Sequence, residues 1–136
     1  MNTKLLRRAQ AAILAEPKQF LMEDYFTCKP SDVHPRLRRI PNCGTAGCIA
    51  GHVLALMEGW DLNTAELRAS AAETLQRATH ALDLTTLQAY QLFFTTYWPE
   101  RFLKHYLQAG SMRAKAQAAS DYIDYFIKTT AKKVAA

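Results

Sequence analysis

The amino-acid sequence predicts an all-α fold: a single-domain bundle of about six helices that spans residues 1–136, with a long ordered loop at residues 18–42. Three observations lead to this prediction. Apolar residues recur three and four positions apart in separate segments, as they do in amphipathic helices. Capping residues precede these segments, and Gly or Pro follows most of them. A chain of 136 residues that is 49% hydrophobic has enough apolar surface for one core of ordinary size.

The first helix and the loop after it are predicted from opposite patterns. Leu5, Ala9 and Ile13 recur with helical spacing, and the helix that carries them should end before Pro17. From residue 18 to residue 42 the period is lost, and prolines interrupt a polar stretch. Long loops inside compact domains are often functional. The prolines are Pro30, Pro35 and Pro41.

The other five helices are predicted from their capping residues. Serine, threonine and asparagine side chains accept hydrogen bonds from the free amides of a first turn, and glycine adopts the left-handed conformation that ends many helices. The second helix should cover residues 46–57, and the third should reach Leu82. The expected N-caps are Thr45, Asn63, Thr85 or Thr86, and Ser111. Trp98-Pro99 should end the fourth helix, and the fifth should begin at Glu100. Gly59 and Gly110 should end the second and fifth helices.

The aromatic residues are predicted to belong to the core. Those around Pro99 are spaced so that they bridge two helices, which favours packing over a platform for stacked bases. Tyr122 and Tyr125 are expected to lie on an ordinary amphipathic face of the last helix. The aromatic residues around Pro99 are Phe93, Phe94, Tyr97, Trp98, Phe102 and Tyr106.

Residues 42–52 concentrate two cysteines, one histidine and three glycines, and they leave three interpretations open. In the first, Cys48 and His52 lie one helical turn apart and bind a metal ion. Cys43 would be a third ligand, and His34 or Cys28 a fourth. Zinc suits such thiolate and imidazole ligands, although Cys-x4-Cys lacks the two-residue spacing of most structural zinc sites.

In the second interpretation a cysteine is a nucleophile. Cys48 falls in the predicted first turn of a helix, where the helix dipole and the free amides lower the pKa of a thiol. The Asn42-Cys43-Gly44 run also looks superficially like the start of the catalytic helix in some papain-like peptidases, which would assign the role to Cys43. No convincing strands follow to supply the histidine of such an enzyme.

The third interpretation, which we favour, is structural. Free cysteines are often buried and pack as small apolar side chains. In this interpretation Gly44 allows a turn, Thr45 caps the helix, and Gly47 and Gly51 leave room for close packing of another backbone. The structural motif is then Cys43, Gly44, Thr45, Cys48 and Gly51.

The same element carries a resemblance. Cys43-Gly44-Thr45-x-x-Cys48-Ile49-Ala50-Gly51 resembles the signature of a group of small uncharacterised helical proteins of bacteria and their phages, over roughly residues 12 to 119. Further matches are Phe20-x-Met22-x-x-Tyr25, Ala81-Leu82-Asp83-Leu84, the pair near Leu92-Phe93, and Trp98-Pro99-x-x-Phe102. The chain departs from the group at Gly47 and at His52. The resemblance implies a helical architecture and a prokaryotic or phage origin, and it supplies no catalytic residue.

The charge distribution points to a macromolecular partner. The net charge is +5, and arginines cluster in the proline-rich loop at Arg36, Arg38 and Arg39. Arginine is enriched at protein interfaces and at phosphate contacts. We therefore expect a non-enzymatic binding or regulatory protein that engages a larger protein, or alternatively a nucleic acid, through this basic loop.

Cellular context follows from what the sequence does not contain. No apolar run approaches the roughly 20 residues that span a membrane, and no signal peptide is recognisable. The chain contains three cysteines, an odd number, which is typical of a reducing compartment. We expect a cytoplasmic protein with no membrane partner and no cofactor, zinc being the alternative.

Overall fold

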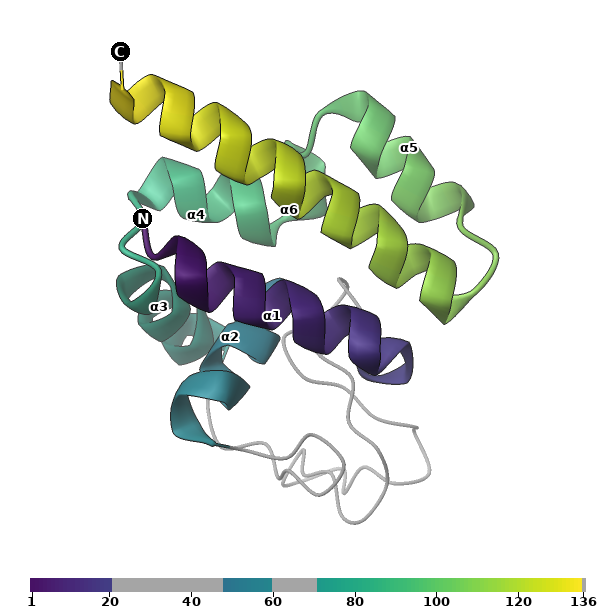
Figure 1. The fold of residues 1–136 in the computed structure, drawn as a ribbon, viewed down its shortest axis with the longest axis horizontal. Coiled ribbons are helices and arrows are strands. Elements are labelled where there is room, and N and C mark those ends of the chain that lie inside the picture. Colours follow the sequence, from purple (N-terminus) through teal and green to yellow (C-terminus); the bar gives the residue numbers. More distant parts are fainter. Residues whose placement is uncertain (21–47, 60–70, 136) are drawn as a thin grey trace.

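The computed structural model describes residues 1–20, 48–59 and 71–135, which form the helical bundle of Figure 1. The predicted all-α fold is confirmed. The N-terminal elements are α1 (Thr3–Ala15), the 3-10 helix η1 (Pro17–Gln19) and α2 (Ile49–Glu58). They are followed by α3 (Ala71–Ala81), α4 (Thr86–Phe93), the 3-10 helix η3 (Thr95–Tyr97), α5 (Glu100–Gln108) and α6 (Met112–Ala135). None of the helices in these described ranges is long and apolar enough to cross a membrane.

Helix α6 organises the bundle. It spans 24 residues, and both α1 and α5 pack along it (Figure 1). Helix α2 packs on the other side of α1 and also contacts α3. The interfaces contain fully buried aliphatic side chains such as Leu6, Ile13, Val53 and Ile123, with buried alanines that allow close helix approach. These alanines are Ala9, Ala50, Ala78, Ala116, Ala118 and Ala119.

Several predicted caps are present. The Thr85 side chain accepts a hydrogen bond from the Gln88 amide while the Gln88 side chain accepts one from the Thr85 amide, which is a complete capping box. The Ser111 hydroxyl accepts from the Ala114 amide at 3.0 Å. Gly59 ends α2 with a φ of 70°, the left-handed conformation expected of it.

Three boundaries differ from the prediction. Helix α2 begins at Ile49 with Cys48 at its N-cap, not at Ala46, so Cys48 precedes the first turn. Helix α5 ends at Gln108 with Ala109 as its C-cap, so Gly110 is not needed to end it. Helix α4 ends at Phe93, five residues before Trp98.

The early end of α4 has a physical reason. The last carbonyls of a helix lack partners within it. Here two aromatic side chains supply donors: the Trp98 Nε1 donates to the Leu92 carbonyl at 3.1 Å, and the Tyr122 hydroxyl donates to the Gln91 carbonyl. The chain can therefore leave the helix at Phe94, which is extended, without exposing unbonded buried carbonyls.

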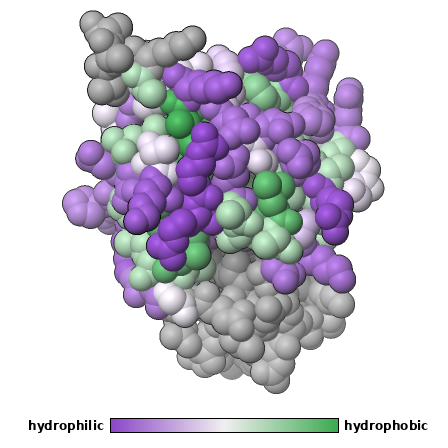
Figure 2. Space-filling model, viewed as in Figure 1, coloured by the Kyte–Doolittle hydropathy of each residue, from purple (hydrophilic) through white to green (hydrophobic). Residues whose placement is uncertain are grey.

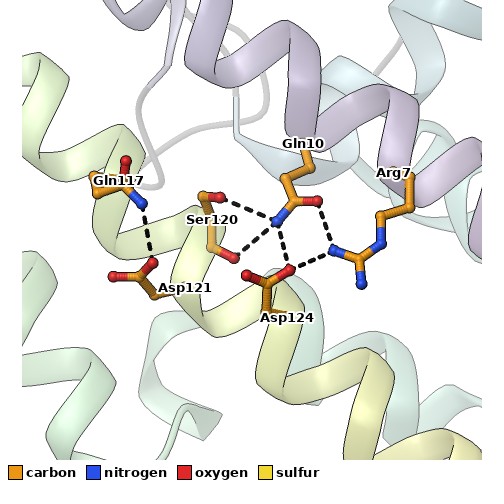
Figure 3. Close-up of polar contacts among 6 residues, drawn as sticks. All are labelled: Arg7, Gln10, Gln117, Ser120, Asp121 and Asp124. Carbon is orange, nitrogen blue, oxygen red and sulfur yellow. Dashed lines mark hydrogen bonds and ion pairs between the residues drawn. The ribbon is translucent and has the colours of Figure 1, made fainter.

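A polar cluster joins α1 to α6, and we call it the α1–α6 clasp (Figure 3). The buried Gln10 side-chain nitrogen donates to the Ser120 carbonyl and hydroxyl, both at 3.0 Å, and to Asp124 at 2.9 Å. Arg7 donates to the Gln10 side-chain oxygen at 2.8 Å and pairs with Asp124. The hydrogen bond from Gln10 is the largest cause that lowers the pKa of the Asp124 carboxyl; burial opposes it, and the hydrogen bond and charge of Arg7 add to the lowering.

Candidate functional site

The structure places Cys48 and His52 in the core, on successive turns at the start of α2. Both are 2% exposed. The His52 Nδ1 lies 2.9 Å from the Cys48 carbonyl oxygen, which also accepts the His52 backbone amide at 3.0 Å. The Phe20 ring packs against the imidazole with centroids 6.0 Å apart. The four-residue spacing thus brings the imidazole onto a backbone carbonyl, and Nδ1 acts there as a donor.

The other members of the predicted sites lie outside the described residues. These are Cys43 and His34 of the metal site, Gly44 and Thr45 of the structural motif, and the arginines of the basic loop, Arg36, Arg38 and Arg39. Gly51 is buried within α2. Across residues 1–20, 48–59 and 71–135, no three histidine, cysteine or carboxylate side chains converge as metal ligands. The metal, nucleophile and basic-loop interpretations therefore remain predictions.

A second region, which the sequence did not single out, contains a hollow between α4 and α6 with a volume of about 380 Å³. Helix α4 supplies one wall, α6 the opposite wall, and the turn between η3 and α5 closes one end. We call this feature the α4–α6 hollow. It is lined by Thr85, Leu87, Gln88, Gln91, Tyr97, Pro99, Tyr122, Tyr125, Phe126, Thr129 and Thr130.

The helical period of α6 explains why it supplies this wall. Tyr122, Phe126 and Thr130 are four residues apart, so they lie one above another on the buried side of the helix. Tyr125 and Thr129 form the adjacent, half-exposed row. Tyr122 and Tyr125, which the sequence predicts to lie on an ordinary amphipathic face, thus form part of one wall of the α4–α6 hollow.

Aromatic contacts hold these walls in place. Tyr122 stacks on Trp98 with centroids 4.5 Å apart, and Tyr125 lies 5.0 Å from Phe102. Arg101 covers the outer side of the second pair, 4.7 Å from the Phe102 centroid and 5.0 Å from that of Tyr125. Burial, and next the neighbouring Tyr125, raise the pKa of the Tyr122 phenol, so it stays protonated and donates to Gln91 at every physiological pH.

The hydroxyl groups that line the hollow differ in their hydrogen bonding. The Thr129 hydroxyl donates to the Tyr125 carbonyl at 2.9 Å, and the Thr85 hydroxyl caps α4. Thr130 is only 6% exposed, yet its hydroxyl makes no hydrogen bond with any other residue that the structure describes. None of the eleven lining residues is charged. The hollow therefore offers an aromatic, uncharged surface with one threonine hydroxyl that makes no described hydrogen bond.

The outer side of α4 is also apolar. Leu87 is 60% exposed and Tyr97 is 52% exposed. Tyr90 lies between them, with its ring 5.4 Å from that of Phe94 and 5.8 Å from that of Tyr97. We call Leu87, Tyr90, Phe94 and Tyr97 the α4 stripe.

A second hollow, of about 390 Å³, lies on the opposite side of α4 from the first. Tyr90 belongs both to the stripe and to the lining of this second hollow. The α4 stripe is therefore flanked by a depression on each side. The second hollow is lined by Leu75, Gln76, Thr79, His80, Leu84, Thr86, Ala89 and Tyr90.

The predicted core role of the aromatic residues is only partly correct. Phe93, Trp98 and Tyr106 are buried, whereas Tyr97 is mostly exposed because η3 turns its side chain away from the bundle. A signal for this surface does exist in the sequence. Residues 84–99 contain no charged side chain, although α4 has an exposed face. Surface helices are usually charged on that face, and the centres of protein interfaces are depleted in charge.

Comparison with known proteins adds no assignment: no family model, curated protein or solved structure matches this chain. Function is therefore inferred from the geometry of the chain itself.

Proposed function

We propose that this chain is a small non-enzymatic binding protein that engages a larger protein through the α4 stripe. The observation that carries the proposal is a row of apolar side chains from Leu87 to Tyr97, exposed at both ends and half-buried at Tyr90 and Phe94, in a segment without charged residues and with a hollow on either side of α4. Exposed apolar patches rimmed by polar residues mark interaction sites.

One other face of the molecule differs from this one. The face that Figure 2 shows, over α1, α5 and α6, is mostly hydrophilic, and its apolar residues lie in small separate groups. Covering such a face would remove water from many charged groups, which is costly. Covering the α4 stripe buries leucine and aromatic side chains, which is favourable, and the only polar groups among them are the hydroxyls of Tyr90 and Tyr97.

The hollows favour a folded or helical protein partner. Interface affinity is concentrated in a few large side chains that enter pockets on the other surface. Two depressions on opposite sides of one short helix can receive two such anchors from one partner segment. The Thr130 hydroxyl and the uncharged lining of the α4–α6 hollow suit an uncharged anchor.

The basic loop of Arg36, Arg38 and Arg39 remains a second proposed contact, and the alternative partner there is a nucleic acid. Mutation separates the two surfaces, because the arginines and the α4 stripe share no residue. Changing the three arginines to alanine should weaken binding if the loop takes part. Nucleic-acid binding would also fall steeply as the salt concentration rises from about 50 to 200 mM.

The experiment that tests the proposal compares two matched exposed leucines. Leu87 on the α4 stripe is 60% exposed, and Leu107 on α5 is 63% exposed. Wild-type protein, Leu87→Glu and Leu107→Glu are immobilised in parallel, and proteins from the source cells that bind each are quantified by mass spectrometry. A captured protein is then purified and titrated against all three.

We expect the partner to bind wild type and Leu107→Glu alike and to bind Leu87→Glu at least about tenfold more weakly, as for an interface hot spot. Equal binding to all three would contradict the proposal. So would a stable homodimer of the purified chain that Leu87→Glu dissociates, because the stripe would then bind a second copy of this chain. Partner binding that nuclease treatment abolishes would assign the partner to nucleic acid instead.

A further inference from the structure

We infer that the α4–α6 hollow binds an uncharged aromatic ring that carries a hydrogen-bonding group, namely the phenol of a tyrosine or the indole of a tryptophan in the partner protein. This inference rests on the proposed function and adds the identity of the anchoring side chain. Size, wall chemistry, the unused hydroxyl and the absence of charge each support it.

The size of the hollow suits one ring system. Its volume of about 380 Å³ lies at the small end of ligand pockets, which run from roughly 300 to 1,000 Å³. Its walls come from α4, from α6 and from the turn that holds Tyr97 and Pro99, so an occupant meets protein on three sides.

The wall chemistry favours an aromatic occupant. Tyr97, Tyr125 and Phe126 present ring faces and edges, and aromatic pairs attract beyond the area that they bury when they meet offset or edge to face. Aromatic contacts already hold Tyr122 and Tyr125 from behind. The walls are therefore fixed before an occupant arrives, and little order is lost on binding.

The unused hydroxyl favours an occupant with a hydrogen-bonding group. Thr130 lines the hollow and is 6% exposed as a residue. Its hydroxyl bonds to no other described residue, whereas the hydroxyl of its neighbour Thr129 donates to the Tyr125 carbonyl. An occupant of the hollow displaces water from the Thr130 hydroxyl, and an occupant that cannot replace the lost hydrogen bond loses affinity. A phenol or indole that enters the hollow would provide one, and the Gln91 side-chain amide on the facing wall could bond to the same group.

The absence of charge excludes charged occupants. None of the lining residues is an aspartate, glutamate, lysine, arginine or histidine. A carboxylate or an ammonium group in this hollow would lose its water without gaining a partner of opposite charge. Arg101 is directed onto the outer face of Tyr125 and Phe102 and is not among the lining residues.

The test titrates the full chain with small analogues of candidate side chains and follows backbone amide signals by NMR. The probes are p-cresol for tyrosine, 3-methylindole for tryptophan, toluene for a ring without a polar group, and p-toluate for a charged ring. We expect p-cresol or 3-methylindole to shift the signals of Gln91, Tyr125 and Thr130 saturably. Toluene should bind several-fold more weakly, and p-toluate should cause no saturable shift there.

Two adjacent threonines provide the matched variants. Thr130→Val removes the unused hydroxyl with almost no change of shape, and it should weaken the preferred probe about two- to tenfold while leaving toluene unchanged. Thr129→Val removes a hydroxyl that is already bonded to the backbone, and it should leave both probes unchanged. Saturating p-cresol or 3-methylindole should also displace the captured partner.

The inference and the proposed function fail in different ways. If no probe shifts the residues of the hollow, or if toluene binds as tightly as p-cresol and 3-methylindole, the inference is wrong even when the partner depends on Leu87. The inference is also wrong if Thr130→Val does not weaken the binding of p-cresol or 3-methylindole. If the probes bind but do not displace the partner, the ring comes from a free small molecule, and the assignment to a partner side chain is overturned.

Discussion

Helix α6 meets α1 and α4 in different ways. Toward α1, aliphatic side chains are fully buried, and each of the four residues of the α1–α6 clasp shown in Figure 3 is hydrogen-bonded to another. Toward α4 there is a hollow of about 380 Å³, lined in part by Thr130, whose hydroxyl bonds to no described residue. The comparison suggests a division of roles, in which the α1 side of α6 stabilises the fold and the α4 side belongs to the proposed binding surface.

The difference originates in the residue types along α6. Its side toward α1 combines aliphatic and short polar residues, such as Ile123 and Ser120, which let the helices approach and allow Gln10 to reach across. Its side toward α4 carries the large rings of Tyr122, Tyr125 and Phe126. These rings line the hollow, and the Tyr122 hydroxyl joins α6 to α4 by donating to the Gln91 carbonyl.

The largest expected effect comes from the closed side. Leu6 in α1 is completely buried, so Leu6→Ala should lower the free energy of unfolding by about 2–5 kcal/mol through lost burial and a cavity. Urea denaturation followed by circular dichroism measures this value. Leu87→Ala, at a site that is 60% exposed, is the control and should change stability by less than about 0.5 kcal/mol. Similar losses for the two variants would contradict the contrast between the two sides.

A smaller effect is expected at the one point where α6 and α4 are hydrogen-bonded. Tyr122→Phe removes the donor to the Gln91 carbonyl and keeps the ring. This variant should lower the free energy of unfolding by about 1–2 kcal/mol, because the carbonyl at the end of α4 loses its partner. The loss stays small because water can enter the adjacent hollow and bond to that carbonyl. Tyr125→Phe is the control, since no described bond of its hydroxyl holds the helices together, and it should be nearly neutral. If both tyrosine variants melt at the wild-type temperature, this bond does not hold α4.

Sequence reasoning succeeded where structure is decided locally. The caps at Thr85 and Ser111 and the left-handed glycine at Gly59 were predicted, because each depends on a few neighbouring residues. The start of α2 was missed, because threonine capping preference placed it at Thr45 whereas the helix begins at Ile49 in the core. A side-chain preference of about 1 kcal/mol is easily outweighed by burial of Cys48, Ile49 and Ala50.

The hollow could not have been derived from local pattern. It depends on how α4 crosses α6, which the positions of Trp98 and Tyr122 determine through contacts between residues far apart in the chain. Periodicity identifies Tyr122 as a residue of the buried stripe, but it does not say whether a neighbouring helix covers that stripe completely. The uncharged run at residues 84–99 is the one sequence feature that marks this part of the surface.

The α1–α6 clasp also predicts a dependence of stability on pH. The pKa of Asp124 is lowered in the folded protein, so its contribution is present above the pKa of about 3.9 of an unfolded aspartate and is lost as the pH falls through the lower folded value. The side chain is 49% exposed, which limits the contribution to about 1 kcal/mol or less. Asp124→Asn should reduce the loss of stability below pH 4, measured by urea denaturation. If the stability of Asp124→Asn depends on pH as that of the wild type does, the charge of Asp124 makes no contribution to stability through the clasp.

The last prediction concerns single hydroxyl groups, and here removal of a hydroxyl should matter on one side of α6 and have almost no effect on stability on the other. Ser120→Ala removes an acceptor of the Gln10 side chain within the clasp and should destabilise the fold by about 0.5–1.5 kcal/mol. Thr130→Val removes a hydroxyl that lines the hollow and bonds to no described residue, so the folded state loses no described hydrogen bond. Thr130→Val should therefore change stability by less than about 0.5 kcal/mol, as measured by thermal and urea denaturation. Unchanged stability together with weaker aromatic binding would support a role of this hydroxyl in recognition, whereas a loss like that of Ser120→Ala would mean that Thr130 serves the fold.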